Sequence, residues 1–239
     1  QIMSNNLLKG KRGIIFGALY DMSIAWKVAE RAQEEGATFT LTNAPIAMRM
    51  GAINDLSEKT NSEVIPADAT SVEDLKHLFE KSQEILGGKV DFVLHSIGMS
   101  PNVRKKKPYT GLNYEWYKQT LDVSAMSLHK TLQVAYDMDA LNNWGSVLAL
   151  TYIAAQRIFP DYNDMADAKS LLESITRSFG YHYGTAKKVR VNTISQSPTV
   201  TTAGSGVSGF DKFISFSENM SPLGNCLLYT SPSPRDIPL

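Results

Sequence analysis

The sequence predicts an α/β fold in which a doubly wound parallel sheet forms one domain. Short apolar and β-branched runs alternate along the chain with longer segments whose apolar residues recur at helical spacing. The short runs are almost continuously apolar, as in parallel strands that are covered on both faces. Strand–helix–strand alternation is typical of a parallel sheet with right-handed crossovers. A length of 239 residues, with no linker and no second core pattern, favours a single domain.

The expected strands, in chain order, are residues 13–18, 38–43, 63–67, 90–96, 146–152 and 189–195. After the first strand, an apolar stripe from Ile24 to Ala32 predicts a helix that ends at Gly36, because glycine easily adopts the left-handed conformation. Ser71 and Asp74 have the spacing of a capping box and predict the start of another helix. Two longer helices are expected near residues 114–140 and 164–183.

The composition excludes several classes of protein. The 24 Lys and Arg residues balance the 24 Asp and Glu residues, so the chain has no electrostatic footprint for nucleic acid. No apolar run approaches the roughly 18 residues of a membrane helix, and no signal peptide is recognisable. The single cysteine favours a reducing compartment. We therefore expect a cytoplasmic protein that binds neither nucleic acid nor membrane and has no metal site.

Ligands of such sheets bind beyond the carboxyl ends of the strands, so the residues just after each strand are informative. Gly17 follows the first strand and Ser23 precedes the next helix, as in a dinucleotide site, although a plain strand–helix connection explains Gly17 about equally well. Asp68 follows the third strand, where its carboxylate either accepts from an adenine amino group or begins a loop. His95 and Gly98 end the fourth strand; we expect a core histidine, and a glycine that lets a cofactor approach.

The fifth strand introduces the residues best suited to chemistry. Tyr152 ends this strand, Tyr162 follows ten residues later, and Lys169 another seven residues on. The last interval is about two helical turns and places Tyr162 and Lys169 on one face. A phenol beside an ammonium group is a plausible proton donor and oxyanion stabiliser, although tyrosine and lysine are also common on amphipathic helices.

These motifs together resemble the bacterial NADH-dependent enoyl-acyl carrier protein reductases, a Rossmann-type family within the short-chain dehydrogenases and reductases, in a Bacteroides-group-like version. The resemblance covers about residues 7–225 and rests on Gly17-x5-Ser23-Ile24-Ala25, His95-Ser96-Ile97-Gly98, Tyr152-x9-Tyr162-x6-Lys169, residues 190–195 and Pro198. Short-chain dehydrogenases that act on alcohols use Tyr-x3-Lys, but Ala166 stands at that lysine position. A carbonyl- or alcohol-converting dehydrogenase remains the alternative function, and a non-catalytic nucleotide-binding regulator the third.

The resemblance implies a reaction in the last reductive step of fatty-acid elongation, in which NADH passes hydride to the β-carbon of a trans-2-enoyl thioester. Tyr162 would hydrogen-bond the thioester oxygen, and Lys169 would hold the nicotinamide ribose. Tyr152, Met99 and Met165 would line the substrate pocket. The implied cofactor contacts are Gly17, Ser23, Ile24, Asp68, Ala69, Ser96, Ile97, Gly98, Lys169, Pro198, Thr199 and Thr201.

The resemblance also implies a lid, a partner and an assembly. The Thr-, Ser- and Gly-rich residues 198–209 would be the substrate-binding loop that closes over the site, in preference to a surface loop without a role. The enoyl group would arrive on acyl carrier protein, and the protein would be a homotetramer. The basic run from Arg104 to Lys107 is either a docking site for that acidic carrier or a solvated surface. After the second strand no acidic residue is present to bind a ribose hydroxyl, so NADH is expected and NADPH is not excluded.

The C-terminal end of the chain departs from this pattern. Residues 226–236 read CLLYTSPSPRD, which is the translation of a common transposase sequencing adapter. We therefore predict a Rossmann-type enoyl reductase domain over residues 3–225 and a non-native tail over 226–239. The domain would lack the family's last strand and helix, so this chain is expected to express poorly and to be inactive.

Overall fold

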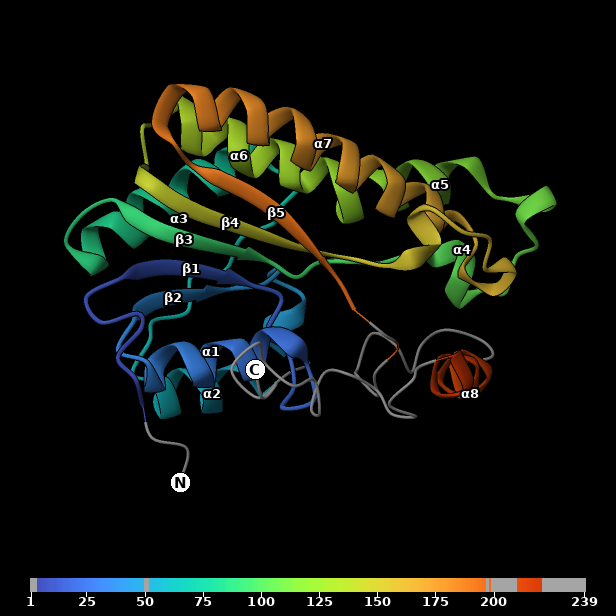
Figure 1. The fold of residues 1–239 in the computed structure, drawn as a ribbon, viewed down its shortest axis with the longest axis horizontal. Helices are drawn as coiled ribbons and strands as arrows, with labels where there is room; N and C mark the ends of the chain where they lie inside the picture. The colour runs from blue at the N-terminus through green and yellow to red at the C-terminus, as the bar shows by residue number, and fades with distance from the viewer. Residues whose placement is uncertain (1–3, 50–51, 197, 199–209, 221–239) are drawn as a thin grey trace, which may run out of the picture.

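The computed structural model describes residues 4–49, 52–196, 198 and 210–220. In this part of the chain a five-stranded sheet lies between two layers of helices (Figure 1). Its order is β2-β1-β3-β4-β5 and every neighbouring pair is parallel. The strands are β1 (Arg12–Phe16), β2 (Thr38–Thr42), β3 (Val90–His95), β4 (Leu141–Thr151) and β5 (Arg190–Ser195). This order is that of a doubly wound sheet, so the predicted fold class is confirmed.

The strand predicted over residues 63–67 is wrong. This segment forms only one isolated parallel bridge, between Leu41 and Val64, although Ile65 and Ala67 each donate a backbone hydrogen bond to the region of β2. Pro66 has no N–H group, and the segment has β2 on one side only. The segment therefore lies along the edge of the sheet without becoming a regular strand.

The helices cover both faces of the sheet (Figure 1). On one face lie α1 (Ile24–Glu34) and α2 (Ile53–Thr60). The other face is covered by α3 (Val72–Leu86), α5 (Tyr114–Leu121), the π-helical η3 (Asp122–Met126), α6 (Ser127–Asp137) and α7 (Asp164–Lys187). The remaining elements are η1 (Ala47–Arg49), α4 (Pro101–Arg104), η2 (Tyr109–Gly111), η4 (Ile153–Ala155), η5 (Pro160–Tyr162) and α8 (Phe210–Met220).

The alternation of side chains along β1 divides the interior into two cores. Ile14 and Phe16 pack into one buried cluster with Leu78 and Leu128, from the layer of α3 and α6. Ile15 packs into a second cluster with α1 and α2. Successive side chains of a strand point to opposite faces, so one central strand supplies apolar residues to both cores.

The predicted helix limits are largely confirmed. Ser23 caps α1 and Gly36, with a φ of 90°, follows its end. Ser71 accepts a hydrogen bond from the Asp74 N–H at 3.2 Å and caps α3. The single long helix predicted over residues 114–140 instead consists of α5, η3 and α6, because one π-helical turn interrupts the α-helical hydrogen bonding.

No helix in the described ranges is both long and apolar enough to cross a lipid bilayer. The predicted tail over residues 226–239 lies outside the described residues. The proposed domain limits therefore remain a prediction.

Candidate active site

The carboxyl ends of β1 and β3 meet where the order of the strands reverses. Gly17 follows β1 with a φ of 93°, and a Cβ atom added there would lie 1.8 Å from the carbonyl oxygen of Ser96, which follows β3. Only glycine lets the two loops come this close. Gly98, two residues after Ser96, is exposed, and Ile97 is half-buried. The two loops thus present bare backbone at the switch point, where α/β sheets bind ligands, and this cradle fits a dinucleotide.

Helix α1 begins at Ile24, seven residues after Gly17. Ser23 acts as its cap, and its Oγ accepts a hydrogen bond from the Trp26 N–H at 3.3 Å. The first N–H groups of a helix lack partners within it and carry the positive end of the helix dipole. This end therefore suits the pyrophosphate contact that the sequence predicts for Ser23 and Ile24.

The loop after β2 and the edge segment is held by its own polar groups. Asp68 is exposed, and its Oδ1 accepts hydrogen bonds from both the N–H and the hydroxyl of Thr70 at 2.9 and 2.7 Å. The side chain of Asp68 therefore begins a turn, which is one of the two roles left open by the sequence. Lys130, on α6, donates a hydrogen bond to the Thr70 carbonyl oxygen at 2.9 Å and so holds the loop against this helix. Contact of Asp68 and Ala69 with adenine remains a prediction.

Tyr152 and Tyr162 lie against each other. Their ring centroids are 5.0 Å apart with an interplanar angle of 58°. Phe159 packs on the other side of Tyr152 at 5.3 Å, and Phe216 of α8 meets Phe159 edge-on at 6.1 Å. Burial raises the pKa of the Tyr162 phenol far above its ordinary value, and it also raises the pKa of Tyr152. Both phenols therefore stay protonated at neutral pH and can donate hydrogen bonds.

Lys169 is buried on α7, two turns after Tyr162. Its Nζ donates a hydrogen bond to the carbonyl oxygen of Leu150 at 2.8 Å, close to the end of β4. The same amine lies 3.9 Å from the position that a Cβ atom at Gly98 would occupy. Burial lowers the pKa of Lys169 to about 8, so the side chain is still mainly an ammonium ion at pH 7. The structure thus brings Lys169 next to the backbone of the β3 loop.

Ser124, which the sequence reasoning missed, joins two of the predicted substrate residues. Its Oγ accepts from the Met99 N–H at 2.9 Å and lies 3.0 Å from the Met99 carbonyl oxygen and 3.6 Å from the Met165 sulfur. Met165 in turn reaches to within 3.3 Å of a Cβ position at Gly98. Ser124 belongs to the π-helical turn η3, a feature that is frequent at functional sites. Ser124 shares its buried helix face with Thr120, Ser127 and Thr131, and this run of hydroxyl residues at helical spacing is the signal that the sequence offered.

His95 is a core residue, in agreement with the sequence. It is 1% exposed, and its Nε2 lies 2.8 Å from the Ser127 hydroxyl. Burial, and to a lesser degree the charge of Lys169, lower its pKa to about 3, so the ring is neutral. It occupies β3 behind the loop that carries Gly98.

The predicted lid lies mostly outside the described residues. Pro198 is buried, whereas Thr199, Thr201 and the rest of residues 199–209 are not described. The helix that follows, α8, contacts the site through Phe216 and Phe159. Phe159 was also missed, although an aromatic residue between Tyr152 and Tyr162 marks the position.

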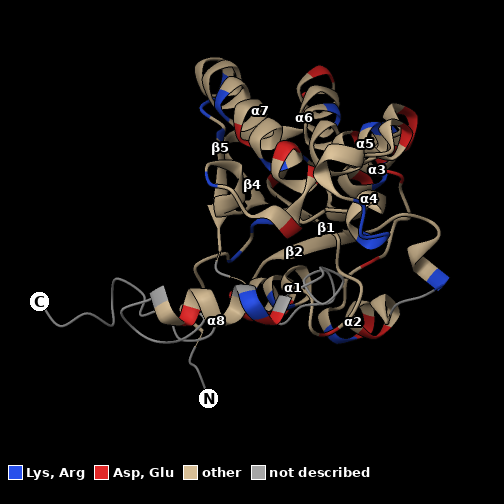
Figure 2. Cartoon of the chain, turned by 90° about the vertical axis from the view of Figure 1, so that its right-hand side faces the viewer, with Lys and Arg blue, Asp and Glu red and all other residues tan. Residues whose placement is uncertain are grey.

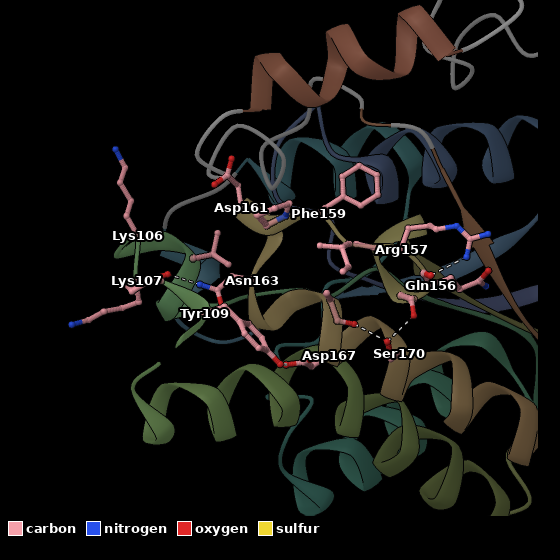
Figure 3. A pocket seen from close by; sticks show the side chains of 17 residues that line it. Lys106, Lys107, Tyr109, Gln156, Arg157, Phe159, Asp161, Asn163, Asp167 and Ser170 are labelled. Atoms are coloured by element: carbon pink, nitrogen blue, oxygen red, sulfur yellow. Dashed lines mark hydrogen bonds between the residues drawn. The ribbon is translucent and has the colours of Figure 1, made fainter. Parts of the chain in front are cut away.

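A cavity of about 840 Å³ lies beside the site, between the loop after α4, the loop after β4 and α7 (Figure 3). It shares Phe159 and Asn163 with the surroundings of the tyrosines, but Tyr152, Tyr162 and Lys169 are not among its lining residues. Figure 3 shows Tyr109 pointing to Asp167, whose carboxylate accepts a hydrogen bond from the Tyr109 hydroxyl at 3.0 Å. The cavity is therefore a neighbour of the predicted chemistry and not its location.

The doubly wound sheet, the glycine cradle at its switch point and the two tyrosines with Lys169 define a nucleotide-dependent reductase of the short-chain dehydrogenase/reductase type. Residues 17–231 match the sequence model of the family described as "Enoyl-(Acyl carrier protein) reductase". The chain therefore belongs to the enoyl-(acyl carrier protein) reductase family, and the predicted family is confirmed.

Individual relatives agree with this assignment. The chain is 32% identical over 222 residues to the enoyl-[acyl-carrier-protein] reductase [NADH] 2 of Rhizobium meliloti. This alignment covers 92% of this chain and 80% of the relative. Its structure matches that of the FabI–NADH complex from Alistipes finegoldii with a TM-score of 0.91 and 65% identity, over 92% of this chain and 78% of that one. The Aquifex aeolicus enoyl-[acyl-carrier-protein] reductase (NADH) matches with a TM-score of 0.82 and 29% identity, over 92% and 84%.

Proposed function

We propose that the chain reduces trans-2-enoyl thioesters, with Tyr162 as the donor to the thioester oxygen and Lys169 as the residue that holds the cofactor ribose. The reaction class follows from the family. The Rhizobium relative is named as an NADH enzyme, and the Alistipes structure is a complex with NADH. The observation that carries the residue roles is the contact between the rings of Tyr152 and Tyr162, above the end of β4 where Lys169 is anchored.

NADH, when bound, supplies the hydride for the β-carbon of the enoyl group. The residues that would hold it are the backbone of Gly17 and residues 96–98, the capped N-terminus of α1 and the ammonium group of Lys169. The close approach of the two loops at Gly17 supports this assignment, since a side chain there would collide with the Ser96 carbonyl group and push the loops apart. Asp68, Ala69, Pro198, Thr199 and Thr201 complete the proposed contacts.

Tyr162 stabilises the charge that develops on the substrate. When the β-carbon gains hydride, negative charge builds up on the thioester oxygen as an enolate. The Tyr162 phenol donates a hydrogen bond to that oxygen, and its raised pKa means that it stays a donor instead of ionising. A preorganised donor in a dry site contributes about 3–4 kcal/mol to the transition state. Tyr152, Met99 and Met165 would line the acyl pocket and exclude water.

The carrier and the assembly are also part of the proposal. The exposed basic run from Arg104 to Lys107, at the end of α4 in Figure 2, supports docking of an acidic acyl carrier protein. A homotetramer in the cytoplasm completes the proposal, and exposed Tyr136 and Tyr181 on α6 and α7 offer aromatic surface for a contact between copies.

The test replaces Tyr162 by phenylalanine. We expect kcat with NADH and a trans-2-enoyl thioester to fall by about 10²–10³-fold, because one oxyanion donor is lost while the ring remains. The loss of reduced-nicotinamide absorbance is followed for the chain, and also for a version extended by the segment of the Alistipes protein that follows the aligned region. Tyr183→Phe, in the core, is the matched control. Equal kcat in Tyr162→Phe and the parent would contradict the role of Tyr162, and oxidation by a ketone but not by the enoyl thioester would contradict the reaction.

A further inference from the structure

A buried carboxylate lies two residues after Tyr162 and has no part in the chemistry described above. Asp164 is the first residue of α7 and is 0% exposed. The described residues form no salt bridge with it. Burying an unpaired charge is costly unless hydrogen bonds replace its water, so the environment of Asp164 must compensate for it.

The compensation comes from the loop that follows β3. The Ser100 hydroxyl donates to Asp164 Oδ1 at 2.6 Å, and Asn102 Nδ2 donates to Oδ2 at 2.9 Å. Ser100 and Asn102 are themselves 4% and 0% exposed. Asn102 Oδ1 accepts from the backbone N–H of Asn113, the residue that caps α5. Both oxygens of Asp164 are thus tied to the segment that also carries Gly98 and Met99.

The residue between Tyr162 and Asp164 has a strained backbone. Asn163 has a φ of 53° and a ψ of −136°, a region that residues with a side chain rarely adopt. Its Nδ2 donates to the carbonyl oxygen of Lys107, in the loop after α4. Such a conformation persists only where the surroundings hold it, and they do so here on both sides, through Lys107 and through Asp164.

We infer that Asp164 is a positioning residue for the reductase: with Ser100 and Asn102 it forms a buried clamp that locks the strained turn carrying Tyr162 onto the β3 loop that carries Gly98 and Met99. The inference rests on the proposed role of Tyr162. The clamp fixes the phenol and the substrate-lining loop in one relative position, which hydrogen-bond donation to a developing oxyanion requires. A buried ionic group is weak as a source of stability alone, which favours a role in specifying geometry.

The test exchanges the two partners of the clamp. Asn102→Asp replaces the amide donor by a second carboxyl group at the 2.9 Å contact, and the contact then persists only if the pair takes up a proton. Asn102→Asp combined with Asp164→Asn restores an amide–carboxylate pair with the parent's net charge, without the 3.2 Å bond that Asn102 Nδ2 donates to the Asn113 carbonyl. Ser100→Ala removes one donor to Asp164 together with the cap of α4, and it is the second variant if Asn102→Asp does not fold. Asp167→Asn is the matched control, because Asp167 lies one turn further along α7 and also accepts two hydrogen bonds, from Tyr109 and Tyr117.

We expect Asn102→Asp to lower kcat at least tenfold with less than a threefold change in KM for the enoyl thioester, because the clamp acts on the alignment of Tyr162. The exchanged pair should recover kcat to within threefold of the parent, and Asp167→Asn should stay within twofold. Ser100→Ala should lower kcat by at least threefold. An unchanged kcat in folded Asn102→Asp or Ser100→Ala would overturn the inference, as would an exchanged pair that melts like the parent but stays as slow as Asn102→Asp. A parent enzyme that binds NADH yet never oxidises it would instead overturn the proposed function.

Discussion

Gly17→Ala is the substitution whose effect follows most directly from the geometry. The new Cβ atom would lie 1.8 Å from the Ser96 carbonyl oxygen, and since Cβ atoms essentially never approach closer than 3.0 Å, the two loops must separate by at least about 1.2 Å. The φ of 93° adds a further cost for any residue with a side chain. Loop β1–α1 and loop β3–α4 would therefore no longer form one cradle.

The two costs can be given an order of magnitude. A left-handed conformation costs about 1–2 kcal/mol for an L-residue, and forcing extra atoms into packed structure costs about 1–3 kcal/mol. Together they predict a loss of roughly 2–5 kcal/mol in the free energy of unfolding. For a chain of this size each kcal/mol lowers Tm by about 2–4 °C, so we expect a decrease of about 10 °C.

The measurement is thermal unfolding of the parent, of Gly17→Ala and of Gly98→Ala. Gly98 is the matched control, because an added Cβ there would meet the flexible ends of Met165, at 3.3 Å, and of Lys169, at 3.9 Å. The Tm of Gly98→Ala should change by no more than about 2 °C. A titration with NADH follows, in which Gly17→Ala should bind at least tenfold more weakly. A melting temperature within 2 °C of the parent for Gly17→Ala would refute the argument that the two loops require glycine.

Two further outcomes are expected. Burial lowers the pKa of Lys169 to about 8, below its unfolded value of 10.5, so the folded state loses the proton first as the pH rises. The free energy that the buried charge costs the folded state therefore disappears between about pH 8 and pH 10.5. Urea unfolding should therefore show that Lys169→Met gains stability over the parent at pH 7 and that this gain shrinks above pH 8; a gain that grows with pH would contradict the burial. The hydroxyl of Tyr183 is buried without a hydrogen-bond partner among the described residues, so Tyr183→Phe should raise Tm by about 2–4 °C, and a lower Tm would indicate a partner for the hydroxyl.

The fold could be predicted from the sequence because its elements follow local rules. The Ser23 cap and Gly36 act through their immediate neighbours and were placed correctly, and five of the six apolar runs overlap a strand. The strand predicted over residues 63–67 did not form, because Pro66 has no N–H group to donate and because pairing also depends on a neighbouring chain, which apolar composition does not reveal. The π-helical turn failed for a similar reason, since its hydrogen bonds differ from those of an α-helix without a change in apolar pattern.

The candidate site was predicted only where a motif carries it. Tyr152, Tyr162 and Lys169 stand at a recognisable spacing, and the structure places the two rings in contact and the amine at the end of β4. Phe159 and Ser124 have no motif, because their roles depend on contacts between segments far apart in the sequence. Asp164 was missed since a carboxylate at a helix start is usually a surface residue that favours the helix dipole.

The π-helical turn η3 also divides one continuous rod into two halves with different neighbours. The first half, α5, packs against α4 and α7, whereas the second half, α6, packs against α3 as well as α7. One extra residue rotates everything after it by about 100° about the helix axis, so each half can turn its apolar side to its own neighbours. Deleting a single residue from η3 would restore a regular α-helix but leave one half out of phase with its layer. The extra residue thus sets the rotation of α6 about its own axis relative to α5.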